Sequence, residues 1–265
     1  MKYLSLASGS SGNCHYIEKN GTRILVDVGL SGKAAEQGLS FHGLDLSKIR
    51  AIFITHEHAD HIKGAGVVSR RYDIPIYATK GTWQAIGDSL GKIKEKNRRI
   101  FEKNTAADFG DLRLFPFETS HDAKDPCGFL FTDGQQKLAI ATDLGCVTSR
   151  VEYAVLSSDL VVLEANHDVE MLKMGSYPYH LKRRVLSDCG HLSNETAGEF
   201  AVDLTCSGTK AILLAHLSGE NNHPLLAYET VASRMKTSLI RVQQDVRLSV
   251  LERGRPSDLI DLRLL

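Results

Sequence analysis

Four short apolar runs in the sequence each end in a side chain that can bind a metal ion or transfer a proton. Runs of this length and composition are typical of buried β-strands. The runs are residues 51–55 before His56, 137–142 before Asp143, 159–163 before Glu164, and 211–215 before His216. Polar groups at the ends of several strands predict a functional site at one edge of a sheet.

The remaining pattern predicts an α/β protein. Residues 23–28 and 112–119 are expected to form two more strands, and residues 239–251 a half-buried strand. Helices are expected at residues 62–72, 79–90, 193–206 and 224–235. Because no regular βα period is present, the mixture favours an α/β sandwich over a barrel. No linker or repeat divides the chain, so one domain is expected over residues 1–265.

Composition narrows the class of protein further. The chain has 32 basic and 32 acidic residues, a balance that gives no hint of a nucleic-acid partner. No apolar run approaches the roughly 20 residues that span a bilayer, and the N-terminus is too short for a signal-peptide core. Its five cysteines include no Cys-x-x-Cys pair, which favours reduced thiols. These features predict a cytoplasmic protein without a membrane partner.

Residues 56–61 read His-Glu-His-Ala-Asp-His and follow a predicted strand. Imidazole and carboxylate are ligands of zinc, manganese and iron. A zincin requires His-Glu-x-x-His, but Asp60 occupies the last position of that frame. The motif therefore predicts a catalytic metal site other than that of a zincin. His121 is a further candidate ligand.

The motif and the later ligands resemble the metallo-β-lactamase superfamily over essentially the whole chain. This resemblance implies a four-layer αββα sandwich with two divalent metal ions, zinc or manganese with iron possible, at a sheet edge. It implies that one ion is bound by His56, His58 and His121, and the other by Asp60, His61 and His216. Asp143 would bridge the two ions. Asp27 would support the loop of residues 56–61 that carries the first ligands. Asp143 argues against β-lactamases with a cysteine at the second metal, and His58 argues against di-iron relatives that carry glutamate there.

A second motif favours phosphodiester substrates. Residues 190–197 place His191 at the start of a predicted helix, with Ser193 as its cap. This resembles the histidine-serine motif of RNase Z and related nucleases, in which the histidine contacts the scissile phosphate and Glu164 matches its acidic partner. The resemblance implies that His191 and Glu164 assist the leaving 3′-oxygen, while Asp60 orients the attacking hydroxide. A simple helix cap with a solvent-facing histidine is the alternative.

Two loops, residues 8–14 and 217–224, look like those of the WalJ/YycJ-type bacterial exonucleases, which are associated with 5′→3′ degradation of DNA and with repair. The interval between Asp143 and His216 is too short for the β-CASP insertion of related nucleases. A Gly/Ser loop can also be an ordinary turn. The candidate phosphate contacts outside the metal site are Ser10, Ser11, Asn13, Ser193 and Asn222.

Local charge adds a candidate nucleic-acid surface. Residues 92–103 hold six basic and two acidic residues, and residues 173–184 hold four basic and no acidic residues. The second segment also contains Tyr177 and Tyr179, which could stack on unpaired bases. Lys182, Arg183 and Arg184 are its candidate phosphate contacts, although a solvated face remains the alternative.

These patterns predict a metal-dependent phosphodiesterase, with DNA bearing a 5′ end as the expected partner. Two other classes stay open. One is a small-molecule hydrolase of the same fold, such as a cyclic phosphodiesterase or a thioester or lactone hydrolase. The other is a non-catalytic scaffold, which the complete set of metal positions disfavours. No obligate protein partner can be inferred.

Overall fold

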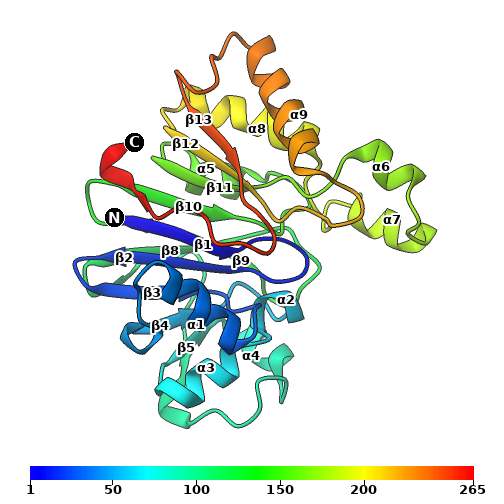
Figure 1. Cartoon of the computed structure of the whole chain (residues 1–265). Helices are drawn as coiled ribbons and strands as arrows, with labels where there is room; N and C mark the ends of the chain where they lie inside the picture. Colours follow the sequence, from blue (N-terminus) through cyan, green and yellow to red (C-terminus); the bar gives the residue numbers. More distant parts are fainter. The chain divides into compact units, whose positions relative to one another are not determined.

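Two mixed β-sheets of seven strands each, with helices between the strands, make up the chain (Figure 1). The computed structural model describes all residues from Met1 to Leu265. Contacts divide these residues into two compact units. Unit 1 comprises Met1–Pro116, Ala123–Cys127 and Glu252–Leu264, and unit 2 comprises Phe117–Asp122 and Gly128–Leu251. The predicted α/β class is confirmed, whereas a single domain stays a prediction.

The first sheet lies in unit 1. Its strand order is β14 (Ile260–Asp261), β1 (Lys2–Ala7), β2 (Cys14–Lys19), β3 (Thr22–Val26), β4 (Ala51–Phe53), β5 (Ile76–Ala78) and β6 (Arg98–Ile100). Pairing is antiparallel from β14 to β3 and parallel from β3 to β6. All three residues of β4 are buried, as the apolar run before His56 predicts.

Unit 1 also holds helices α1 (Gly32–Phe41), α2 (Ala59–Ile62), α3 (Ala65–Tyr72) and α4 (Lys80–Ile86), with 3₁₀ turns η1 (Leu46–Lys48) and η2 (Glu95–Asn97). Instead of one helix over residues 62–72, the chain forms α2 and α3, because the Gly64 amide bonds to Val28 O (2.8 Å). α4 ends before residue 90 because residues 86–91 form two turns. Side-chain caps at Ser31 and Thr79 begin α1 and α4.

The second sheet has the order β13 (Arg247–Val250), β12 (Ala211–Ala215), β11 (Leu160–Glu164), β10 (Lys137–Ala141), β9 (Cys127–Thr132), β8 (Leu112–Glu118) and β7 (Ala107–Phe109). Strands β10 to β13 are parallel. β10, β11 and β12 are almost wholly buried, which explains their continuous apolar runs. Their carboxyl ends meet at one edge of the sheet.

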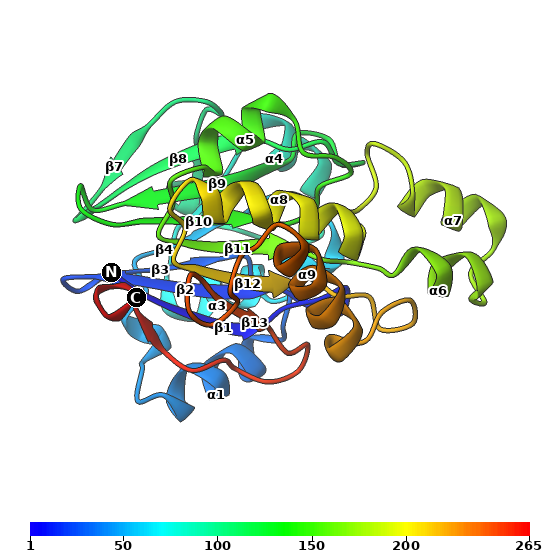
Figure 2. The ribbon, with the colours of Figure 1, turned by 90° about the horizontal axis from the view of Figure 1, so that it is seen from above.

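Unit 2 contains α5 (Ser149–Val155), α6 (Val169–Met174), α7 (Tyr179–Val185), α8 (Asn194–Cys206) and α9 (Pro224–Thr237). α8 and α9 pack side by side, whereas α6 and α7 project away from the strands of this unit (Figures 1 and 2). The predicted helices at 193–206 and 224–235 agree with α8 and α9 to within two residues. A 3₁₀ turn, η3 (Leu262–Leu264), lies near the C-terminus. No helix of the chain has the length and apolar content needed to cross a membrane.

Candidate metal centre

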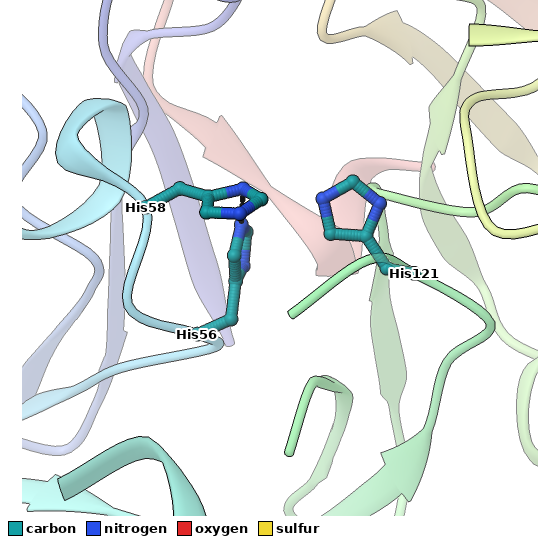
Figure 3. A group of neighbouring side chains, drawn as sticks. All are labelled: His56, His58 and His121. Carbon is teal, nitrogen blue, oxygen red and sulfur yellow. Dashed lines mark hydrogen bonds between the residues drawn. The ribbon is translucent and has the colours of Figure 1, made fainter. Parts of the chain in front are cut away.

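Four potential metal ligands follow β4 in a loop and the first turn of α2: His56, His58, Asp60 and His61. Nε2 of His56 lies 3.0 Å from Nδ1 of His58, and the two rings meet edge to face (Figure 3). The ring centroids of His56 and His61 are 4.1 Å apart, and His61 Nε2 lies 3.6 Å from Asp60 Oδ2. Unit 1 therefore brings three imidazoles and one carboxylate together.

Asp27 holds this loop from the end of β3. Its Oδ2 accepts hydrogen bonds from His61 Nδ1 (2.7 Å) and Thr55 Oγ1 (2.8 Å), and its Oδ1 accepts one from the Thr55 amide (2.9 Å). The bond to His61 fixes the tautomer that leaves Nε2 available to a cation. Burial raises the pKa of Asp27, although these hydrogen bonds oppose that rise.

The N-terminal loop is joined to the same metal loop through Asn13. The Asn13 amide donates to Asp60 O (2.8 Å), its side-chain Oδ1 accepts from the Gly9 amide (2.9 Å), and its Nδ2 lies 3.1 Å from His61 Nε2. Backbone packing here is tight, because a Cβ on Gly29 would lie 1.6 Å from Asp60 O. Asn13 is thus buried against the candidate ligands.

The strand ends of unit 2 carry the other predicted residues. His121 follows β8, Asp143 follows β10, Glu164 ends β11, and His216 directly follows β12, while His191 precedes α8. Parallel pairing of β10, β11 and β12 brings their carboxyl ends to one edge. Donor atoms of Asp143, Glu164, His191 and His216 all lie within 4.8 Å of one another.

Glu164 is the centre of this group. Its buried carboxylate accepts hydrogen bonds through Oε1 from Nδ1 of His191 (2.9 Å) and of His216 (2.8 Å). Its Oε2 accepts from the amides of Leu144 (2.8 Å) and Leu192 (3.1 Å). Burial would raise the pKa of Glu164, but attraction to His191 and the two imidazole hydrogen bonds outweigh burial and hold it well below its usual range. An anionic Glu164 therefore accepts from Nδ1 of both imidazoles and fixes their tautomers.

Two further contacts orient His121 and Asp143. His121 donates through Nδ1 to Gly190 O (3.1 Å), and its Nε2 lies 3.6 Å from Asp143 Oδ1 (His121 is drawn in Figure 3). Nδ1 of His216 lies at the same distance from that carboxylate oxygen. Burial lowers the pKa of His121, so its imidazole is neutral, the form that binds metal ions.

Three of the strand-end residues share an uncommon backbone conformation. Asp27, Asp143 and His216 have φ values of 59°, 59° and 56°, in the left-handed region. A non-glycine residue persists there only when its surroundings hold it, and such residues cluster at functional sites. The same conformation therefore turns a functional side chain away from the end of its strand in both sheets.

Several predicted phosphate contacts are engaged in internal hydrogen bonds. Ser193 Oγ caps α8 by accepting from the Thr196 amide (3.2 Å). The side chains of Asn222 and Asn194 form two reciprocal hydrogen bonds of 3.0 and 2.9 Å, and Asn222 also donates to Ala165 O. The sequence analysis did not identify Asn194. Ser10 and Ser11 are exposed.

His167 is a buried residue that the sequence analysis did not select. It is 1% exposed, and neither ring nitrogen has a hydrogen-bond partner. Burial lowers the pKa of His167 to about 4, against the opposing attraction of Glu164. Its imidazole is therefore neutral under ordinary conditions. Its position three residues after Glu164 was the only available sequence signal.

The basic residues of α7 have different environments. Lys182 donates to Lys173 O (2.7 Å), the Arg183 guanidinium lies 5.9 Å from the Tyr179 ring centroid, and Arg184 is paired with Asp122. Arg183 and Tyr179 are exposed. In unit 1, Lys94 and Lys96 both pair with Asp73. This acidic residue offsets part of the positive charge of the basic segment at residues 92–103.

The donors within each unit are of the types that bind divalent metal ions. The loop of unit 1 holds three imidazoles and one carboxylate, and in unit 2 His121 and His216 lie beside the carboxylate of Asp143. Their orienting hydrogen bonds run to carboxylates or to a backbone carbonyl, an arrangement common around histidine ligands. No cysteine thiolate is part of either group, which is compatible with zinc, manganese or iron.

Comparison with known proteins identifies the family. The profile described as a beta-lactamase superfamily domain matches residues 22–217. The chain is 44% identical over 227 residues to exodeoxyribonuclease YycJ of Bacillus anthracis, covering 86% of each chain. It is 42% identical over 249 residues to exodeoxyribonuclease WalJ of Streptococcus pneumoniae, covering 93% of each chain.

Solved structures agree on the fold. The metallo-β-lactamase fold protein YhfI of Bacillus subtilis superimposes with a TM-score of 0.69 at 16% identity, covering 97% of this chain and 100% of that one. Human tRNase Z, short form, gives a TM-score of 0.65 at 17% identity and covers 97% of this chain and 99% of that one. At such identities the likeness concerns the fold alone. The profile match and the two relatives show that the chain belongs to the metallo-β-lactamase superfamily and is a hydrolase of that fold.

Proposed function

We propose that the chain is a metal-dependent phosphodiesterase that degrades DNA from a 5′ end, as a 5′→3′ exonuclease of the repair type in the cytoplasm. The observation that carries this proposal is the hydrogen bond between His191 and Glu164 at the strand ends that also bear Asp143 and His216. Two relatives that cover 86–93% of the chain are named exodeoxyribonucleases, which supports a nucleic-acid substrate.

The superfamily fold implies divalent metal ions, and we assign two to this chain, zinc or manganese with iron possible. The proposed ligands are His56, His58 and His121 for one ion, Asp60, His61 and His216 for the other, and Asp143 for both. The assignment is supported by the donor types and by the orientation of His61, His121 and His216 through Nδ1. Bound divalent ions supply a hydroxide near neutral pH and stabilise charge on the phosphoryl group.

The side chains of this chain perform the proton chemistry. Asp60 is proposed to orient the attacking oxygen through its carboxylate. Glu164 holds His191 through Nδ1, so that Nε2 can carry a proton to the leaving 3′-oxygen. General acid catalysis by a positioned imidazole contributes about 10²–10⁴ in rate.

The α7 surface is the proposed contact for the nucleic acid. Exposed Arg183 and Tyr179 lie together and combine a cation for phosphates with a ring for stacking. Lys182 adds a second cation nearby. In unit 1, the exposed hydroxyls of Ser10 and Ser11 are further candidates for a phosphate oxygen.

Asn13, Ser193 and Asn222 were also predicted to contact phosphate. Their side chains take part in internal hydrogen bonds, so we propose that they act through the loops they hold. No obligate protein partner is proposed.

Digestion of end-labelled DNA and RNA, single- and double-stranded, with added manganese or zinc tests the function. We expect stepwise release of nucleotides from the 5′ end of DNA. Hydrolysis of bis-p-nitrophenyl phosphate without any degradation of 5′-phosphorylated DNA or RNA would instead indicate a small-molecule phosphodiesterase. His191→Ala is the control for contaminating nucleases.

A further inference from the structure

The end of α7 and the turn that follows it contact three consecutive residues around the predicted ligand His121. Arg184 pairs with the Asp122 carboxylate, Ser120 Oγ donates to Asp188 O (2.5 Å), and His121 donates to Gly190 O (3.1 Å). We propose that this segment, residues 184–190, is a clamp that positions His121 and His191, with Arg184 as its positioning residue. The inference rests on the proposed function only for the role of these two histidines.

The packing around the clamp leaves little freedom. The Gly145 amide donates to Ser120 O (2.7 Å), and a Cβ on Gly145 would lie 2.1 Å from Asp188 O. Three backbone segments of unit 2 are thus in direct contact at this point. A side chain on residue 145 would have to separate the clamp from the turn that carries His121.

The clamp links the two imidazoles through one peptide unit. The carbonyl of Gly190 fixes the tautomer of His121, and the next residue is His191, which bonds to Glu164. The His191 amide in turn donates to Val185 O (3.0 Å), in the last turn of α7. Displacement of the α7 end would therefore move the support of His121 and the backbone of His191 together.

Arg184 also pairs with the carboxylate of Asp122, the residue next to His121. Asp122 Oδ1 lies 3.4 Å from His121 Nε2, the nitrogen proposed to bind metal. The Arg184 guanidinium pairs with the other carboxylate oxygen of Asp122, Oδ2, and offsets the negative charge of that side chain. Without Arg184, the carboxylate is expected to compete for His121. The two side chains are 54% and 28% exposed, so their loss should affect ligand geometry more than folding.

The test compares Arg184→Ala, Arg184→Lys and Asp122→Asn, in the full chain. Arg150→Ala is a matched control, because Arg150 pairs with Glu118 in the same unit, at similar exposure, without contacting His121. The measurements are Zn²⁺ affinity by chelator competition, the His121 tautomer by long-range ¹H–¹⁵N spectra, and kcat and KM on bis-p-nitrophenyl phosphate. This substrate is too small to require the α7 surface.

We expect Arg184→Ala to lower Zn²⁺ affinity and kcat by about tenfold or more with KM unchanged, as loss of a ligand's hydrogen-bonded support does. Asp122→Asn should lower both values less, because it removes the competing charge together with the ion pair. Arg184→Lys keeps the positive charge and should retain more activity than Arg184→Ala. Zn²⁺ affinity and kcat of Arg184→Ala within about twofold of the unsubstituted protein, or an Arg184→Lys variant as impaired as Arg184→Ala, would overturn the proposal. If the unsubstituted protein hydrolyses no phosphodiester, the proposed function fails, but Zn²⁺ affinity and the tautomer still test the clamp.

Discussion

Nδ1 of His191 lies 2.9 Å from Oε1 of Glu164, a carboxylate that is fully buried. The imidazole is partly exposed and its other nitrogen is not used in this bond. A carboxylate in this position fixes the orientation and the tautomer of the ring. This geometry supports the proposal that the pair transfers a proton through Nε2 of His191.

Replacing His191 by alanine should preserve metal binding and remove turnover. His191 is not among the seven proposed ligands, so two ions per chain are expected by elemental analysis. The rate on DNA should fall by about 10²–10⁴, the contribution of a positioned general acid. Full activity in His191→Ala would exclude the assigned role.

Glu164→Gln should have a broader effect than His191→Ala. The amide keeps the size of the side chain but loses the charge, and one oxygen must still accept from both His191 and His216. We expect a loss of about 10²-fold or more in kcat together with weaker binding of one metal ion. The His191→Ala and Glu164→Gln losses should not add in the double variant, because the residues act as a unit. Additive losses would show independent roles.

His58→Ala and Asp143→Ala should each abolish hydrolysis through loss of metal. His58 contacts His56, and Asp143 lies between His121 and His216 at 3.6 Å from each. We expect less than two ions per chain by elemental analysis and no recovery of activity at micromolar metal. The exposed His180→Ala is the control for removing an imidazole, and it should retain both ions. Retention of two ions in Asp143→Ala would contradict the bridging assignment.

The sequence was sufficient to predict the strands that bear the site. Buried parallel strands such as β10, β11 and β12 have continuous apolar runs, and their ends are marked by Asp143, Glu164 and His216. Strands such as β5 and β6 were not predicted, since they are three residues long and β6 is fully exposed. Their pairing depends on neighbouring strands rather than on local pattern.

The contacts that orient the ligands were predicted only in part. Glu164 was found because it ends a predicted strand, whereas the role of Asp27 was predicted from the resemblance to the superfamily. The reciprocal amide pair of Asn194 and Asn222, and the carbonyl of Gly190 that orients His121, depend on loops that meet only in the folded chain. Backbone carbonyls carry no residue-specific signal, so such a partner cannot be read from a sequence.

Asn13→Ala should destabilise the protein, whereas Ser11→Ala should not. Asn13 is buried, and its removal leaves the Gly9 amide without its acceptor and takes away one contact of His61 Nε2. Loss of a buried partner costs about 1–3 kcal/mol in the free energy of unfolding. Ser11 is exposed in the same loop, so its change should stay within about 0.5 kcal/mol. Denaturant unfolding measures both, and equal values for the two variants would contradict the structural role of Asn13.

The buried imidazole of His167 should make stability dependent on pH on the acid side. Its pKa is about 4 in the folded chain against a model-peptide value of 6.5, so the unfolded chain binds the proton more readily. The free energy of unfolding therefore decreases as pH falls from about 6.5 towards 4, by about 3 kcal/mol at most. Below that range, His167 causes no further decrease.

His167→Leu should remove this contribution, because leucine fills the site without titrating. Its free energy of unfolding should fall less between pH 7 and pH 4 than that of the unsubstituted protein, when both are measured with the same metal content. His180→Leu makes the same change at an exposed position and should leave the acid side of the profile unaltered. A His167→Leu profile parallel to that of the unsubstituted protein would show that His167 is not the group whose protonation opposes folding.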